Sequence, residues 1–262
     1  MIFAIKKQYG NQTIRIPIRT RQPEKMTIKV YHSHKPYTYY FDTSASISGT
    51  DAFMVNIPKI PDEVYIEIYN DRNGHLQNDN SFRIGAISVI PLVPKFGIEK
   101  IMDKNVSSFA KFSDDFAENA GILSAQNSIY ISPDGKFRIN YVDVIKDMQG
   151  NPLPTPARIN SKTKIIEIAK KYYLGYTVPG RKAINWHEFS HLWRNFNAAD
   201  EVEADKNAIM IYLGMGNPKI EAFNVFLKVF KNRPSDGNVN RYNEIYGFIK
   251  NFDKIMQKQL TN

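Results

Sequence analysis

Apolar and polar residues alternate in short runs through the first third of the chain. These runs are IFAIK, QTIRIPI, KMTIKVYH, PYTYYFD, EVYIEIYN and FRIGAISVI. In EVYIEIYN, residues 63–70, valine and isoleucine alternate with tyrosine and glutamate. A period of two in β-branched and aromatic sequence predicts strands with one buried and one solvent face. Residues 1–92 are therefore predicted to form an all-β sandwich or small barrel, which we expect to dock a substrate or an assembly neighbour.

The pattern changes at PLVPKFG, residues 91–97, where two prolines and a glycine mark a domain boundary. Beyond it, phenylalanines at 109, 112 and 116 recur at helical spacing. A helix is also predicted at KTKIIEIAKKYYLG, residues 162–175, and TVPGRK is predicted to be the loop that follows it. Further helices are predicted at about 183–195, 200–213, 218–231 and 238–258. SIYIS and KFRINYVDV, joined by Pro133-Asp134-Gly135, predict a hairpin. The fold class is therefore α+β, with a mostly helical second domain, residues 98–262, that contains a small antiparallel sheet.

The composition excludes several kinds of chemistry. The 262 residues include no cysteine, so any metal must be held by histidine and carboxylate side chains. MIFAIKKQYGNQ lacks the apolar core of a signal peptide, and no stretch approaches the ~20 apolar residues of a membrane span. We therefore expect no membrane span and a cytoplasmic location at synthesis.

A net charge of +9 raises the question of an anionic partner. Lysine and arginine are spread over both halves of the chain, and the signatures of base-reading modules are absent. This distribution favours a solvated basic surface or an acidic assembly neighbour over nucleic acid.

The segment HEFSH, residues 187–191, is the main candidate for chemistry. His187 and His191 are four positions apart on a predicted helix, so both imidazoles can reach one ion at about 2.0–2.1 Å. Glu188 follows His187 directly, so its side chain leaves the helix in another direction and should not ligate the same ion. It can instead take a proton from the water that the metal activates, which makes it the predicted catalytic residue.

A third ligand is predicted in Asp200-Glu201-Val202-Glu203-Ala204-Asp205, at the start of the next helix. Glu201 and Asp205 lie four positions apart, on one face. Glu201 is the predicted third metal ligand, and Asp205 can accept a hydrogen bond from the outer nitrogen of a ligand histidine. Asp200 is the predicted helix cap. Glu203 remains an alternative ligand.

HEFSH followed by EVEADKNA resembles the gluzincin metallopeptidases, whose pattern is HExxH followed by ExxxD. The resemblance covers roughly residues 125–215, although the nine residues between His191 and Glu201 are fewer than most members have. It implies a zincin-like domain, bound Zn²⁺ and hydrolysis of peptide bonds. It also implies an edge strand above the active-site helix, for which the hairpin at 128–145 is the candidate. Tyr173, Tyr242 and Tyr246 are candidate donors to the oxyanion.

Two other functions remain open. The chain can be a structural subunit of a large assembly, such as the tail or ring of a tailed-phage virion, whose layout it resembles, with or without activity. A protease acting near DNA is disfavoured because such enzymes often carry a zinc ribbon, which requires cysteine. The aromatic run from Tyr37 to Phe41 is interpreted as sheet packing rather than as a stacking platform.

Overall fold

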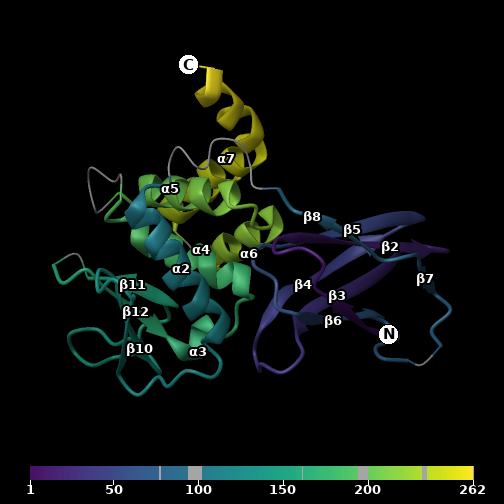
Figure 1. The fold of residues 1–262 in the computed structure, drawn as a ribbon, viewed down its shortest axis with the longest axis horizontal. Helices are drawn as coiled ribbons and strands as arrows, with labels where there is room; N and C mark the ends of the chain where they lie inside the picture. Colours follow the sequence, from purple (N-terminus) through teal and green to yellow (C-terminus); the bar gives the residue numbers. More distant parts are fainter. Residues whose placement is uncertain (77, 94–101, 161, 194–199, 232–234, 262) are drawn as a thin grey trace. The chain divides into compact units, whose positions relative to one another are not determined.

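The chain forms two compact units of different secondary structure (Figure 1). The computed structural model describes residues 1–76, 78–93, 102–160, 162–193, 200–231 and 235–261. One unit contains Met1–Val93 with Gly216–Pro218, and the other contains Pro94–Met215 with Lys219–Asn262. The division lies within the segment 91–97, of which residues 94–97 lie outside the described residues. The fold is α+β, with antiparallel sheets in the N-terminal unit and helices dominating the other.

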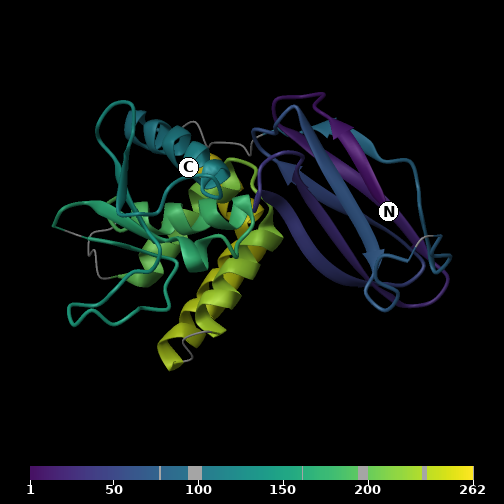
Figure 2. The ribbon, with the colours of Figure 1, turned by 90° about the horizontal axis from the view of Figure 1, so that it is seen from below.

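The strands of the N-terminal unit form two antiparallel sheets, purple to blue in Figure 2. Their bounds are β1 Ile2–Lys6, β2 Gln12–Thr20, β3 Glu24–His32, β4 Tyr39–Ile47, β5 Thr50–Ile57, β6 Glu63–Asn70, β7 Phe82–Ile84 and β8 Ser88–Pro91. One sheet has the order β1-β6-β3-β4, and the other has the order β5-β2-β7, with β8 also paired to β2. Each predicted run contains a strand, but residues 36–38 precede β4, residues 85–87 separate β7 from β8, and β5 was not predicted.

The run FRIGAISVI forms two strands instead of one, and the reason lies in the strand opposite. β7 pairs with Ile18–Thr20 and β8 pairs with Gln12–Arg15, so the interruption faces Ile16 and Pro17. Proline has no N–H to donate to a ladder, and only the Pro17 carbonyl is used, by the N–H of Gly85 at 2.9 Å.

Each sheet of the N-terminal unit has one apolar face that is removed from water. The predicted alternation is confirmed in β6, where Val64, Ile66 and Ile68 are fully buried and the residues between them are partly exposed. The same alternation occurs along β2 and β3. The core of the unit therefore follows directly from the period-two pattern.

The second unit contains a four-stranded sheet of order β11-β12-β10-β9. The bounds are β9 Ser128–Ile131, β10 Arg138–Val142, β11 Ala157–Ile159 and β12 Ile165–Ala169. The hairpin of β9 and β10 is confirmed. The prediction of a small antiparallel sheet was wrong in one respect, because β10 and β12 run parallel and the sheet is mixed. The long connection through β11 reverses the chain twice, which allows this pairing.

The helix predicted over residues 162–175 was also wrong. Ile165–Ala169 forms strand β12, and only Lys170–Tyr173 is helical, as α3. Three isoleucines in IIEIA favour the pleated sheet, where β-branched side chains keep their preferred rotamers. The two ladders that β12 makes with β10 and β11 override the helical spacing.

Helices cover most of the second unit. Their bounds are α2 Lys104–Asn119, α4 Val178–Ser190, α5 Glu201–Gly214, α6 Lys219–Lys231 and α7 Asp236–Thr261. TVPGRK is the first turn of α4 rather than a loop, because the Thr177 hydroxyl accepts from the N–H of Gly180 and Pro179 is tolerated in the first turn. Within the described residues, none of the helices combines the length and apolar character that a bilayer span requires.

Aromatic side chains fix α4 against α2. Phe109 of α2 is fully buried, and its ring stacks on Phe189 of α4 with centroids 4.3 Å apart. Trp186 of α4 meets the same ring edge-to-face at 5.1 Å. α4 is therefore anchored on one face by its aromatic residues, which leaves its histidines on another face.

Candidate metal centre

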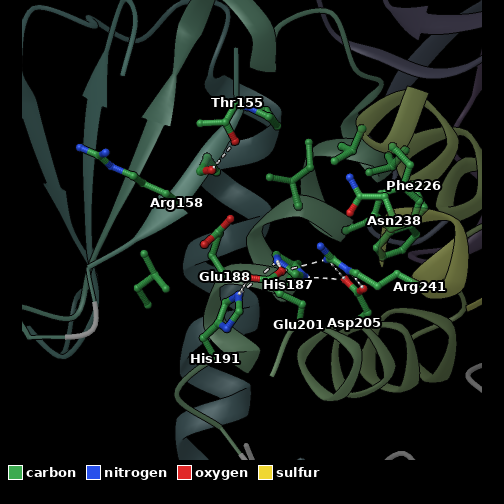
Figure 3. A pocket seen from close by; sticks show the side chains of 18 of the residues that line it. Thr155, Arg158, His187, Glu188, His191, Glu201, Asp205, Phe226, Asn238 and Arg241 are labelled. Atoms are coloured by element: carbon green, nitrogen blue, oxygen red, sulfur yellow. Dashed lines mark hydrogen bonds and ion pairs between the residues drawn. The ribbon is translucent and has the colours of Figure 1, made fainter. Parts of the chain in front are cut away.

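The last turn of α4 brings the two histidines of HEFSH together. His187 lies in the helix and His191 is its C-cap residue, still in a helical conformation. The Nε2 atoms of the two rings lie 3.2 Å apart (Figure 3). The i, i+4 spacing thus directs both nitrogens to one point, as the sequence predicts.

The first turn of α5 adds a carboxylate at the same point. Asp200 caps α5 by accepting from the N–H of Glu203 at 3.0 Å, which confirms its predicted role. Glu201 then places Oε2 at 3.4 Å from His187 Nε2, and Oε1 at 3.7 Å from His191 Nε2. Among the described residues, His187, His191 and Glu201 form the group of possible ligands, and Glu203 is not part of it. The turn predicted through residues 196–198 lies outside the described residues.

These distances fit a single small metal ion. Ligands at about 2.0–2.1 Å from a tetrahedral ion lie about 3.3–3.4 Å from one another. The separations of 3.2, 3.4 and 3.7 Å between the nitrogen and oxygen atoms are close to this value. Two imidazoles and one carboxylate suit zinc and several other transition metals, so the residues can hold a metal without identifying it.

Asp205 supports the outer side of His187. Its carboxylate is fully buried, and Oδ1 lies 2.8 Å from His187 Nδ1 (Figure 3). A carboxylate in this position favours the tautomer of His187 with its proton on Nδ1. The lone pair of Nε2 then points to the place where His191 and Glu201 converge. The structure therefore brings Asp205 to the place where a supporting carboxylate is needed.

Arg241 of α7 is part of the same cluster, and the sequence did not single it out. Its Nε donates to Asp205 Oδ2 at 2.9 Å and its Nη2 to Asp205 Oδ1 at 3.1 Å. Nη2 also lies 2.9 Å from Glu201 Oε2. One guanidinium thus compensates two carboxylates. Arg241 lies 36 residues from Asp205 and is one of 35 basic residues, so no local signal marks it.

The shifted pKa values in the cluster follow from burial and these pairings. Burial raises the pKa of Glu188 to about 7, against the opposing charge of His187, and the carboxylate of Glu201 adds to the increase. Hydrogen bonding from His187 and the charges of His187 and Arg241 lower the pKa of Glu201. Burial disfavours the charged form of His187, but Asp205 and Glu201 outweigh it and raise its pKa.

Glu188 is held beside the ligand group but outside it. It is 7% exposed, and the backbone N–H of Ile159 in β11 donates a hydrogen bond to its carboxylate. Its one-residue offset from His187 turns its side chain toward β11, whereas the histidines face α5. Glu188 is therefore placed to exchange protons rather than to ligate.

A cavity of about 610 Å³ opens over this cluster. Its polar lining includes Thr155, Arg158, Asn238 and Arg241 in addition to Glu188 and the ligand group. Its apolar lining comes from α4 and α6, namely Ala183, Ile184, Val225, Phe226, Val229 and Phe230, and from β11 and the segment before it, namely Leu153, Pro156, Ala157 and Ile159. Elements distant in sequence thus converge on one concave site.

Two predictions about the surroundings of the site were wrong. The strand beside the cavity is β11, not the hairpin at 128–145, because β11 and not β9 forms the sheet edge next to α4. Tyr173 is fully buried and donates to Asn185 Oδ1 at 2.9 Å, away from the cavity. Tyr242 and Tyr246 lie beside each other on α7 and do not line the cavity.

Comparisons with known proteins assign no family to this arrangement. No family model matches the sequence, and no curated protein matches it. A solved structure described as "CBM4 structure and function" is similar with a TM-score of 0.26 and 17% sequence identity. That similarity covers 34% of this chain and 59% of the other, so it spans under two thirds of that chain's length.

Proposed function

We propose that this chain is a zinc-dependent metallopeptidase that hydrolyses peptide bonds with Glu188 as general base. The proposal depends on one observation: His187, His191 and Glu201 converge at ligand distances beside a buried carboxyl group that does not belong to the ligand set. HEFSH and EVEAD supply these residues in the order of the gluzincin pattern and with the spacing of each motif, across a gap of nine residues that is shorter than in most members.

The proposed roles follow from the surroundings of each side chain. A bound Zn²⁺ supplies Lewis acidity toward a carbonyl oxygen and lowers the pKa of water. Glu188 lies beside the ligand group, where it accepts the proton of the attacking water and returns it to the leaving amine. The N–H of Ile159 orients its carboxylate during both transfers.

The proposed substrate is an extended peptide segment. β11 is the edge of its sheet and contributes residues 157–159 to the cavity lining. An edge strand can pair with an added strand through its backbone. Arg241 and Asn238 are donors on the opposite wall, in place of the tyrosines expected from the sequence, and can bind substrate carbonyl oxygens.

Substituting Glu188→Gln tests the proposal. The amide keeps the size of the side chain but cannot accept the proton, so hydrolysis of a peptide library should fall by roughly 10²–10⁴-fold. Elemental analysis should still find about one zinc per chain in both proteins. Glu203→Gln is the matched control, since it changes an acid of the same motif outside the ligand group, and it should retain both activity and zinc.

Two results would contradict the proposal. A purified wild-type chain that retains no zinc after incubation with the ion would show that the cluster is not a zinc site. If zinc is retained but wild type and Glu188→Gln cleave nothing, the cluster has a structural role, and a subunit of a large assembly becomes the better description.

A further inference from the structure

The sheet β1-β6-β3-β4 has a row of tyrosines on its outer face. Tyr31 of β3 lies opposite Tyr65 of β6 and opposite Tyr39 of β4. The ring centroid of Tyr31 lies 5.9 Å from that of Tyr65 and 5.8 Å from that of Tyr39. All three side chains are partly exposed. A register shift between Val30 and Tyr31 places Tyr39 there, while Tyr40 is buried. The aromatic run 37–41 is thus only partly sheet packing.

A charged row follows two residues further along the strands. Lys29 lies opposite Glu67 and Asp42, about 7 Å from the tyrosine row. Tyr69 lies beyond this row. Lys29 Nζ is 5.8 Å from the centroid of its ring, and the centroid of the His75 ring is 4.5 Å from it. His75 Nδ1 also lies 3.3 Å from Glu67. Charged hydrogen-bonding groups therefore lie between aromatic rings. We term this surface the tyrosine face; it consists of Tyr31, Tyr39, Tyr65, Tyr69, Lys29, Glu67 and Asp42.

A cavity of about 370 Å³ adjoins the tyrosine row. It is lined by residues 31–39, the end of β3, the following loop and the start of β4. Tyr31 and Tyr39 belong to both the row and the cavity wall. The row therefore ends beside a shallow, open depression.

Sheet packing accounts for part of this arrangement. Cross-strand aromatic pairs stabilise a sheet, so rings in register need no ligand. Packing does not explain why partly exposed rings flank a row of two carboxylates and one ammonium group beside a cavity. An occupant of this face must stack on rings and also form hydrogen bonds with the charged row.

The chemistry of the face separates the possible occupants. The two carboxylates balance Lys29 and the Lys35 of the adjoining cavity, so the face lacks the excess of positive charge that a polyanion such as nucleic acid needs. A proline-rich peptide would stack on the rings, but its pyrrolidine rings would also cover the charged row. The charged groups would then lose their hydrogen bonds to water, and the pyrrolidine rings offer none in return. A sugar ring presents C–H groups on its flat face and hydroxyls at its edge, and so matches both features.

We propose that the tyrosine face binds a neutral glycan. Sugar rings stack on Tyr31 and its neighbours Tyr39 and Tyr65, while their hydroxyls donate to Glu67 and Asp42 and accept from Lys29. This site is separate from the metal centre and does not depend on peptide hydrolysis. Binding would bring the metallopeptidase domain to glycan-bearing material.

Affinity electrophoresis of the full chain tests this site. Native gels would contain soluble neutral polysaccharides, namely mixed-linkage β-glucan, arabinoxylan, galactomannan or an α-glucan. At least one should retard the wild type, and Tyr31→Ala should weaken that binding by roughly two- to ten-fold through loss of ring contact. Tyr9→Ala is the matched control, because Tyr9 is a 41% exposed tyrosine of the same unit outside the face, and it should bind like wild type.

A second variant guards against misfolding of Tyr31→Ala. Glu67→Gln keeps every ring in place and removes only a charged acceptor, so it should also weaken retardation while its circular dichroism stays that of wild type. The proposal is overturned if no polysaccharide retards the wild type, or if Tyr31→Ala and Glu67→Gln bind as Tyr9→Ala does. It is also overturned if a poly-proline peptide competes while free sugars of the retarding polymer do not.

Discussion

His187 depends on two neighbours with different roles. The carboxylate of Glu201 lies next to Nε2 of His187, and the carboxylate of Asp205 lies next to its Nδ1. Both acids come from one face of α5, so the ExxxD spacing alone delivers a ligand and its support together. Asp205 therefore supports the orientation of His187 without belonging to the group of possible metal ligands.

Asp205→Asn should separate these roles. The amide removes the charge that fixes the His187 tautomer, and we expect metal affinity to fall roughly 10–100-fold, measured by competition with a chelator dye. Asp200→Asn makes the same chemical change at the cap of α5, where asparagine caps equally well, and should leave the affinity unchanged. Equal affinities in wild type and Asp205→Asn would contradict the supporting role.

Ion pairs link α5 to α7 at two places, Arg241 with both Asp205 and Glu201, and Lys206 with Glu244, and the two links differ in burial. Arg241 meets the fully buried Asp205, whereas Lys206 pairs with the exposed Glu244 at 2.8 Å. A buried carboxylate that loses its partner cannot recover its interactions from water, whereas an exposed one can. The attachment of α7 to the metal centre should therefore depend on one of the two links.

Arg241→Gln is expected to lower the free energy of unfolding of the metal-free protein by ~3 kcal/mol, because it leaves Asp205 buried without its guanidinium. Glu244→Gln removes the exposed pair and should cost less than about 1 kcal/mol. Urea unfolding measures both. Similar losses in the two variants would show that Arg241 serves only as a general link between the helices.

The packing of α2 on α4 can be tested in the same way. Phe109→Ala should lower the free energy of unfolding by about 3–5 kcal/mol, because it opens a cavity among fully buried aromatic rings. Leu227→Ala truncates a 52% exposed side chain of α6 and should change the stability by less than about 0.5 kcal/mol. A small loss for Phe109→Ala would mean that the neighbouring rings collapse into the space.

At the scale of the whole molecule, the chain forms two compact units, and the group of possible metal ligands lies in only one of them. A ligand that binds the folded state stabilises the unit that contains its site. Removing the metal should therefore affect the units unequally.

Calorimetry of the full chain with and without a chelator can measure this difference. Two transitions are expected, and the chelator should lower the midpoint of one of them, the same one that Phe109→Ala lowers. Restoring the metal should reverse the shift. A chelator-induced decrease in the other transition, or in both equally, would contradict the placement of the site in the second unit alone.

The sequence by itself determined the features that depend on local geometry. Period-two alternation predicted the strands of the N-terminal unit except β5, and the i, i+4 spacing of His187 and His191 predicted convergent nitrogens. Asp200 could be recognised as a cap for the same reason. These inferences hold because backbone geometry fixes where neighbouring side chains point, whatever the rest of the molecule does.

Tertiary structure decided what depends on distant partners. Arg241 reaches Asp205 across 36 residues, β11 and not the predicted hairpin lies beside Glu188, and IIEIA is a strand because two ladders flank it. In the sheet β1-β6-β3-β4, a register shift turns Tyr39 rather than Tyr40 toward Tyr31. Such contacts are selected by the packing of whole elements against one another, which no window of local sequence encodes.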